Sequence, residues 1–340
     1  MSDSNPEFND FKNAIRSAAR IVVSTHLLPD GDGLGAEVAL YHYLKSAGKQ
    51  VCIHNPDPLP DRYRFLDPAA SFLKSPRPEE AWDSFDLWVI VDTNDPRRLG
   101  GAWDALTPRA KRIFFLDHHP DIVVANRSVL QLPPHAVIVS DTRSSSIGEL
   151  LYQLFTDLNL TPLDLTMASG LYVSVMTDTN SFRYARTTPE SHRIAAHMIE
   201  LGVNPEETYQ QIFSTKGLSH IRLLGILLQN TKVSKSGKLA WLEIPLELRK
   251  RFNATADDTL SFMNLLLVLR DTEIVCLFRE EDDGITVRTS IKSKGKIVVN
   301  RVAMDLGGGG HEYAAGVALK EPFEKVVETV TTRLEALITG

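Results

Sequence analysis

Residues 87–92 read Leu87-Trp88-Val89-Ile90-Val91-Asp92, an apolar run that ends in a carboxylate. A short continuous run of apolar, β-branched and aromatic side chains is typical of a strand buried on both faces of a parallel sheet. The same arrangement recurs twice, with Ile21-Val22-Val23 leading to a loop that holds His26, Asp30 and Asp32, and with Ile113-Phe114-Phe115-Leu116 leading to Asp117-His118-His119. Open α/β sheets bind ligands where their strands end, so these polar side chains are expected to share one site.

Helical patterns separate these strands. Apolar residues recur at helical spacing from Leu34 to Leu44 and stop before Gly48, a residue type that is common at helix C-caps. The segment Ser144-Ser145-Ser146, followed by Glu149, resembles the N-cap region of a helix that begins at residue 147. The β–loop–α–β order predicts an α/β fold, with an N-terminal parallel sheet covered by helices.

The second half of the chain has a different pattern. Helical patterning dominates between Pro189 and Leu228, and strand-like runs at 239–244, 273–278 and 285–291 follow before a closing helix over 321–338. This order predicts a helical connector and then a smaller C-terminal α+β domain. We place the N-terminal domain at 1–195, the connector at 196–228 and the C-terminal domain at 229–340.

Composition places the chain among ordinary soluble globular proteins. Its 340 residues favour two domains, 43% of them are hydrophobic and 24% charged, and the formal net charge is −6. An acidic chain is unsuited to tracking along nucleic acid by bulk attraction, but a local basic pocket for a short phosphorylated ligand is compatible with it. The two cysteines, Cys52 and Cys276, lack metal-type spacing and fit a reducing compartment. The polar first ten residues, and the lack of an apolar run near ~20 residues, predict a cytoplasmic protein with no membrane partner.

The chemistry of the acidic clusters predicts a divalent metal site. A fourth cluster, Thr177-Asp178-Thr179-Asn180, joins the three at the strand ends. One aspartate at a strand end is most often a helix cap or a turn residue, but a repeated Asp/His theme at four such ends favours metal binding. Oxygen-rich ligands with a few imidazoles suit Mn²⁺ or Mg²⁺, whereas a single zinc site relies more on Cys or His. Two histidines and four aspartates match the needs of a two-metal hydrolase with one bridging carboxylate.

Two neighbouring aspartates are interpreted differently. Asp95 precedes Pro96, so it is expected to form a turn. Asp117 is expected to orient the histidine pair that follows it, because carboxylates commonly hold metal-binding imidazoles in place. Neither residue is counted among the metal ligands.

A basic, glycine-containing stretch near the C-terminus is a candidate phosphate site. Residues 285–304 contain no acidic side chain and five basic ones, which are Arg288, Lys292, Lys294, Lys296 and Arg301. A solvated strand face is the alternative, above all for the second and third lysines. The run Gly307–Gly310 costs conformational entropy on ordering, so a close backbone approach to a ligand phosphate is its expected purpose. His311 follows at once and is either a phosphate donor or a plain structural histidine.

Taken together, these motifs resemble those of a known family. His26-x-x-Pro29-Asp30-Gly31-Asp32, Asp92-Thr93, Asp117-His118-His119 and Thr177-Asp178-Thr179 are similar to the four N-terminal motifs of the DHH phosphoesterases. The run Gly307–His311, with Ala314-Ala315-Gly316 after it, resembles the glycine-rich motif of their DHHA1 domain. The length is most similar to that of the stand-alone nanoRNase/pAp phosphatase branch. The resemblance implies hydrolysis of short single-stranded oligoribonucleotides (nanoRNA) to mononucleotides and of 3′-phosphoadenosine 5′-phosphate (pAp) to AMP. It also implies two Mn²⁺ ions per active site, with Mg²⁺ or Co²⁺ as substitutes.

The resemblance further implies roles for individual residues. One metal would be held by His26, Asp30 and Asp92, and the second by Asp32, Asp92, His118 and Asp178, so that Asp92 is the catalytic bridge. His119 would be the catalytic group that faces the substrate phosphate. Which of the two adjacent histidines binds metal rests on the resemblance alone. Substrate contacts would come from Arg288, Lys292, Gly308, Gly309, Gly310 and His311.

Two positions depart from the family pattern. Asn180 stands where many relatives have glycine, so the loop beside the second metal is expected to have its own shape. Lys292 stands where relatives often have arginine, and lysine keeps the charge but loses the bidentate fork. Arg288 lies on the same strand face as Lys292 by period-two alternation and is the candidate to compensate.

Other functions stay open at this point. The same constellation fits the hydrolysis of linear or cyclic dinucleotide messengers (c-di-AMP/pApA type), and on chemistry alone of polyphosphate or pyrophosphate. An exonuclease on long single strands is disfavoured, because that activity usually recruits further nucleic-acid-binding domains. A non-catalytic nucleotide-binding regulator is disfavoured by the complete set of acidic ligands. A homodimer is compatible with the sequence, which fixes neither the oligomeric state nor the cleavage polarity.

Overall fold

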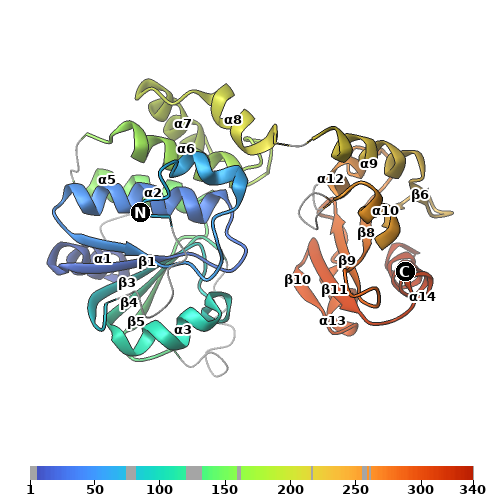
Figure 1. The fold of residues 1–340 in the computed structure, drawn as a ribbon, viewed down its shortest axis with the longest axis horizontal. Helices are drawn as coiled ribbons and strands as arrows, with labels where there is room; N and C mark the ends of the chain where they lie inside the picture. The colour runs from blue at the N-terminus through green and yellow to red at the C-terminus, as the bar shows by residue number, and fades with distance from the viewer. Residues whose placement is uncertain are drawn as a thin grey trace. The chain divides into compact units, whose positions relative to one another are not determined.

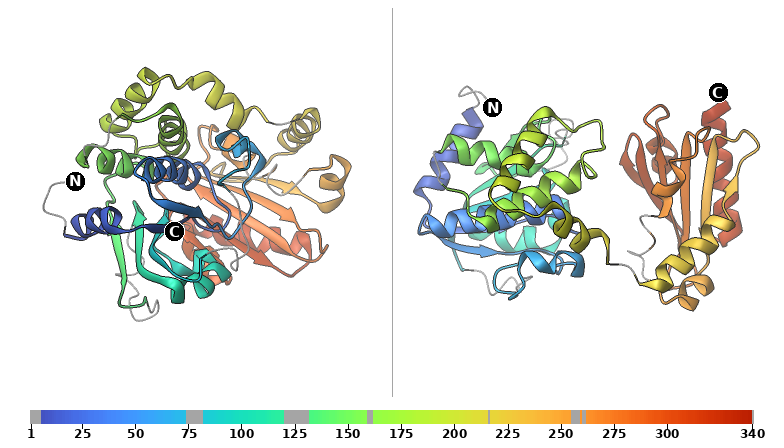
Figure 2. Two further views of the ribbon diagram at one scale, coloured as in Figure 1. Left: turned by 60° about the vertical axis from the view of Figure 1, so that its left-hand side comes forward. Right: turned by 90° about the horizontal axis from the view of Figure 1, so that it is seen from above.

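The computed structural model describes residues 6–73, 82–119, 132–158, 162–215, 217–254, 259 and 262–339. They form two units, Met1–Thr215 and Lys216–Gly340, each with its own sheet (Figures 1 and 2). The division falls inside residues 196–228, which the sequence predicted as a connector. Helix α7 (Pro189–Glu200) packs on α6 (Leu165–Asp178) in the first unit, whereas α9 (Leu218–Gln229) packs on β7 (Leu239–Ile244) in the second.

The first unit contains a parallel sheet, as the strand-like runs predicted. Its strands lie in the order β2-β1-β3-β4-β5, and all four neighbouring pairs are parallel. The strand bounds are Arg20–Ser24 for β1, Gln50–Ile53 for β2, Phe85–Val91 for β3, Ala110–Asp117 for β4 and Ala136–Ser140 for β5. The carboxyl ends of the strands therefore meet at one edge of the sheet.

Helices cover both faces of this sheet, which explains why its strands are apolar throughout. On β3, Leu87, Val89 and Val91 contribute to the larger core. That core is shared with α1 (Pro6–Ser17), α2 (Gly31–Ser46), α5 (Ile147–Asp157), α6 and α7. The alternate residues Trp88 and Ile90 belong to a smaller core that includes residues of α3 (Gly101–Leu106), which lies on the opposite side in Figure 1.

Helices α2 and α6 approach each other unusually closely. A Cβ atom at Gly35 would lie 2.3 Å from the carbonyl oxygen of Gly170, and one at Gly170 would lie 2.5 Å from that of Gly35. Both distances are too short for any other residue, so the two glycines set the separation of the helices. The contact matters for the site, because α2 carries Asp32 in its first turn and α6 ends at Asp178.

Short elements complete the first unit. Ser146 caps α5 by accepting a hydrogen bond from the backbone N–H of Glu149, as the serine-rich segment predicted. The remaining described elements are η1 (Asp61–Leu66), η3 (Pro96–Leu99), η4 (Thr107–Arg109) and α8 (Pro205–Phe213). Helix α8 packs against η1.

The second unit is an α+β domain with a six-stranded mixed sheet in the order β10-β11-β9-β8-β7-β6. The further strands are β6 (Lys232–Val233), β8 (Ile274–Glu280), β9 (Val287–Ser293), β10 (Gly309–His311) and β11 (Ala314–Leu319). Its helices are α9, α10 (Leu246–Arg251), α12 (Phe262–Leu266), α13 (Asn300–Asp305) and α14 (Phe323–Thr339). Residues of α13 and α14 pack in one core of this sheet, and residues of α9 and α12 pack in the other. Among the described residues, no helix has the length and hydropathy needed to cross a membrane.

Replacement of Gly35 by alanine should destabilise the first unit by about 2–3 kcal/mol, because the added methyl group would meet a backbone carbonyl that cannot rotate away. Thermal unfolding followed by circular dichroism measures the effect. Gly101→Ala is the matched control, since a Cβ atom there meets nothing within 4 Å, and its transition should stay near that of the parent chain. Equal transitions for the two variants would contradict the close helix contact.

Candidate functional site

The polar clusters predicted from the sequence come together at the carboxyl edge of the parallel sheet. They lie in the loops after β1, β3 and β4 and at the C-terminal end of α6. Three groups of side chains there have potential ligand atoms within 4.8 Å of one another: His26, Asp30 and Asp92; Asp32, His118 and Asp178; and Asp92, Asp117, His118 and His119. The six residues expected to hold metal all belong to these groups.

The first group is built on the loop after β1. His26 Nδ1 lies 2.7 Å from the carbonyl oxygen of Leu27, and its Nε2 lies 3.2 Å from Asp92 Oδ2. A carbonyl can only accept, so Nδ1 carries the proton and the Nε2 lone pair points toward the carboxylate. Asp30 caps α2 by accepting from the backbone N–H groups of Asp32 and Gly33. It therefore serves as a helix cap and still offers an oxygen to the group.

The second group joins three segments that are far apart in the chain. His118 Nε2 lies 3.2 Å from Asp32 Oδ2 and 3.6 Å from Asp178 Oδ2. His118 Nδ1 lies 3.3 Å from the carbonyl oxygen of Ser144, which again fixes the proton on Nδ1. Asp32 also accepts from the N–H of Ile147 and from the Ser174 hydroxyl. These donors hold a buried carboxylate in place without neutralising it.

Asp92 connects the two groups. Its Oδ2 faces His26, and its Oδ1 lies 3.6 Å from His118 Nε2. The residue is 2% exposed and has a φ of +65°, a backbone region that aspartate enters more readily than most residues but still at a cost of about 1–3 kcal/mol. This conformation places one carboxylate between two histidines, as a bridging ligand requires.

The electrostatics of the site call for a cation. Within the described part of the chain, neither Asp92 Oδ1 nor His118 Nε2 has a hydrogen-bond partner, although both atoms are buried. Burial opposes the charge of His118, but the carboxylates of Asp32 and Asp92 outweigh it and raise its pKa to about 11. Burial also raises the pKa of Asp32 to about 7. So many carboxylates around one imidazole are stable only with protons or a metal ion among them, and the oxygen-rich ligand set fits Mn²⁺ or Mg²⁺.

Asp117 contacts the histidine pair and Asp95 forms a turn, as the sequence predicted. Asp117 Oδ1 accepts from the backbone N–H groups of His118 and His119 and lies 2.8 Å from His119 Nδ1. Asp117 thus orients the histidine pair. Asp95 caps η3 and forms an ion pair with Arg97, so its carboxylate is committed to a turn.

Several residues of the site gave no sequence signal. Glu37, which is fully buried on α2, accepts a hydrogen bond from Asn55 Nδ2, and Asn55 Oδ1 accepts from the N–H of Thr25, next to His26. Arg186 donates to Asp178 Oδ2. A lone glutamate inside a buried helix and an arginine in a loop have no distinctive spacing, so only the fold reveals these contacts.

Asn180 adopts the conformation for which glycine is the usual residue. Its φ is +49°, and Ser181 and Phe182 also have positive φ. The N–H of Asn180 donates to the carbonyl of Thr177, and that of Ser181 donates to the carbonyl of Met176, which together form a Schellman C-cap on α6. Asparagine is the second most suitable residue for this position, so the departure is accommodated.

The residues predicted to contact substrate lie in the second unit. Arg288 pairs with Glu281, and Lys292 Nζ donates to Asn264 of α12. Burial lowers the pKa of Lys292. Lys292 and His311 both pair with Ala314 of β11, so they occupy one row across β9, β11 and β10.

The glycine run was expected to allow a close backbone approach to a ligand phosphate, but the structure gives other causes for three of its four glycines: backbone conformation for one and close packing for two. Gly307 ends α13 with a φ of +85°. A Cβ atom at Gly308 would lie 2.2 Å from the carbonyl oxygen of Gly316, and one at Gly310 would lie 2.5 Å from that of Ala314. A Cβ atom at Gly309 would meet nothing within 4 Å, and Gly309 does not have the positive φ of Gly307 and Gly310.

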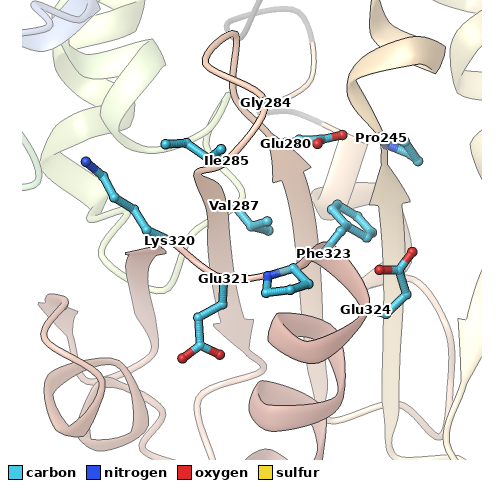
Figure 3. A pocket seen from close by; sticks show the side chains of 10 residues that line it. Pro245, Glu280, Gly284, Ile285, Val287, Lys320, Glu321, Phe323 and Glu324 are labelled. Carbon is cyan, nitrogen blue, oxygen red and sulfur yellow. The ribbon is translucent and has the colours of Figure 1, made fainter.

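The second unit also contains a pocket that none of the predicted substrate-binding residues line. It has a volume of about 560 Å³ and lies beside the start of α14 (Figure 3). Val287 and Phe323 supply apolar surface, and Glu280, Glu321 and Glu324 outnumber Lys320 among its charged residues. That charge balance is unfavourable for a phosphate.

Comparison with known proteins gives two family matches. Residues 20–175 match the model of the DHH family, N-terminal domain, and residues 238–339 match that of the DHHA1 domain. The chain is 28% identical over 325 residues to a bifunctional oligoribonuclease and PAP phosphatase NrnA from Thermus thermophilus, covering 92% of this chain and 90% of the relative. It is 26% identical over 307 residues to the protein of the same name from Bacillus subtilis, covering 88% and 89%.

Solved structures show the same architecture. An exopolyphosphatase-related protein from Bacteroides fragilis superposes with a TM-score of 0.88 at 26% identity, over 99% of this chain and 98% of that one. RecJ from Thermus thermophilus, solved with Mn²⁺, has a TM-score of 0.56 at 18% identity over 97% of this chain and 53% of its own, and shares the fold.

Replacement of Glu37 by glutamine should remove a pH-dependent loss of stability. Burial raises the pKa of Glu37 to about 8 from 4.5, so the folded state favours the neutral carboxyl. The stabilising contribution of the neutral Glu37 carboxyl is fully present below pH 4.5. It is lost, by up to about 1.4 kcal/mol per pH unit, as the pH rises from 4.5 through 8. The melting temperature of Glu37→Gln should rise relative to the parent between pH 5 and 9, whereas the exposed control Glu200→Gln should follow the parent. Parallel profiles for Glu37→Gln and the parent would refute this role.

Proposed function

This chain belongs to the DHH family and carries a DHHA1 domain, and from that membership we propose that it hydrolyses short oligoribonucleotides to mononucleotides and pAp to AMP. It is a phosphoester hydrolase, as its DHH relatives are. The observation that carries the proposal is the pair of ligand groups that share Asp92 at the carboxyl edge of the sheet. The substrate class is supported by relatives named oligoribonuclease and PAP phosphatase that match along about nine-tenths of both chains.

Two divalent ions, with Mn²⁺ as the first choice, fit the residues of the site. His26, Asp30 and Asp92 would hold one, and Asp32, Asp92, His118 and Asp178 the other. When bound, two such ions lower the pKa of a water molecule and neutralise charge on the phosphoryl oxygens. The fit is supported by the buried atoms Asp92 Oδ1 and His118 Nε2, which lack hydrogen-bond partners among the described residues.

The protein's own groups prepare this site before a substrate arrives. The carbonyl oxygens of Leu27 and Ser144 accept from Nδ1 of the two metal-facing histidines, so each ring is already oriented with its Nε2 toward the carboxylates. Burial opposes protonation of His119, but the hydrogen bond to Asp117 outweighs it and raises the pKa of His119. A protonated His119 can donate to a phosphoryl oxygen and stabilise the charge that develops there.

The second unit supplies candidates for binding the rest of the substrate. Lys292 and His311 both pair with Ala314 and therefore lie side by side with it across the sheet. Arg288 precedes Lys292 by an even number of residues and lies on the same face of β9. Gly309 has open space at the Cβ position and, unlike Gly307, no positive φ that would itself call for glycine, so it is the candidate for a close backbone approach to a phosphate. For these reasons we propose that the substrate is contacted by Arg288, Lys292, Gly308–Gly310 and His311. A cytoplasmic location and a homodimer stay predictions.

Turnover of 5′-labelled RNA dinucleotide and of pAp, measured in parallel with Mn²⁺ and with chelator, tests the proposal. Mn²⁺-dependent release of mononucleotide and of AMP is the expected result. A cyclic dinucleotide and a short polyphosphate serve as comparison substrates, the latter because the Bacteroides protein is described as exopolyphosphatase-related. Cleavage of polyphosphate alone would move the assignment away from nucleotides.

Asp92→Asn should abolish turnover and weaken Mn²⁺ binding by at least the ~10–100-fold that even indirect partners of metal ligands contribute. Asparagine tolerates the positive φ of this position, so the fold should survive, which circular dichroism can verify. Asp95→Asn is the matched control, because Asp95 is also buried but pairs with Arg97. Isothermal titration with Mn²⁺ provides the readout, and full binding by Asp92→Asn would exclude the bridging role.

A further inference from the structure

A small pocket in the first unit opens beside the metal-facing carboxylates. It has a volume of about 190 Å³ and is bounded on one side by Asp30, Asp32 and Asp178. The other side is formed by Arg62 and Tyr63 of η1 and by Phe213 of α8. These two short elements pack against each other, so residues about 150 positions apart in the sequence form one wall.

Phe213 keeps part of its ring on the surface beside this pocket. Its side chain is 41% exposed, and it contacts Tyr209 one helical turn earlier, with the ring centroids 4.7 Å apart. Its neighbour Ile212 belongs to the core and also lines the pocket, which anchors the end of α8 beside the carboxylates. An aromatic side chain is thus held in place while part of its surface stays accessible.

Arg62 brings a positive charge to a pocket whose other charged residues are carboxylates. Its guanidinium carbon lies 5.0 Å from the ring centroid of Tyr63. The Tyr63 side chain is 3% exposed, and its hydroxyl is hydrogen-bonded to the Arg62 side chain and to the backbone of Gly31 at the start of α2. The ring therefore provides a fixed support on which the guanidinium can rest.

The size of the pocket limits what it can take. Pockets that enclose a whole small-molecule ligand usually measure ~300–1,000 Å³, so 190 Å³ suits one part of a nucleotide. An accessible aromatic ring suits the base of a nucleotide, whereas a guanidinium beside carboxylates that could hold metal suits its phosphate.

We propose that this pocket is a nucleotide subsite of the first unit, in which Phe213 stacks on the base of the nucleotide whose phosphate lies at the carboxylates, and Arg62 binds a phosphate oxygen of that nucleotide. The inference rests on the proposed function and deepens it. Stacking uses the π-face that every base has, so the subsite favours nucleotides over inorganic phosphates without selecting a sequence.

Steady-state kinetics on matched substrates tests the stacking. Phe213→Leu, which keeps apolar bulk but removes the ring, should raise KM for an RNA dinucleotide about tenfold with little change in kcat. The same variant should leave KM unchanged for a dinucleotide in which the stacked position is abasic. Phe213→Tyr should restore the parent KM. An equal effect on both substrates, or no effect on either, would overturn the subsite.

A binding measurement separates failure of the subsite from failure of the proposed function. Isothermal titration with Mn²⁺ compares AMP with ribose 5-phosphate as probes. Phe213→Leu should weaken AMP about tenfold and leave ribose 5-phosphate unchanged, whereas Arg62→Ala should weaken both. If the parent cleaves neither RNA nor pAp but this pattern holds, the function fails and the subsite stands. If the parent cleaves both and the pattern is absent, the subsite fails and the function stands.

Discussion

The concentration of negative charge around two buried histidines is the constraint on which the rest of the structure depends. Asp92 lies between His26 and His118, and Asp32 and Asp178 approach His118 from other elements. Burying several carboxylates together is costly unless positive charge lies among them. The sheet edge, the first turn of α2 and the end of α6 hold these groups at distances that become favourable when a cation is present.

Backbone groups carry much of the organisation of the site. Two carbonyl oxygens set the histidine tautomers, two N–H groups of the histidine pair bind Asp117, and a third, from Ile147, binds Asp32. Such contacts depend on the path of the chain and are insensitive to the side chains at those positions. The precision of the site thus comes from the loops that leave the strands, and the sheet holds those loops in register.

The sequence indicated the parts of the structure that have strong local patterns. The apolar runs around residues 21–23, 87–91 and 113–116 form the predicted strands, and the clusters that follow them meet at one edge. Strands β10 and β11 were missed, because glycine and alanine have low β propensity and pair here through their backbones alone. The contacts of Glu37, Arg62 and Arg186 were missed for another reason: no motif or spacing rule connects them with their partners, which are Asn55, Tyr63 and Asp178. The run Gly307–Gly310 was predicted to approach a ligand phosphate, whereas the close approach of β11 explains why glycine is needed at Gly308 and Gly310.

The contact between Gly35 and Gly170 has a consequence for how the protein matures. These residues lie on helices whose ends carry Asp32 and Asp178, so one ligand group is assembled from segments that are far apart in the sequence. During synthesis, α2 leaves the ribosome well before α6, and the ion-binding group is completed only when the later helix docks. In the proposed function, a divalent ion at this group would bind the folded chain and not its precursors, so that its cellular supply would favour the final folding step.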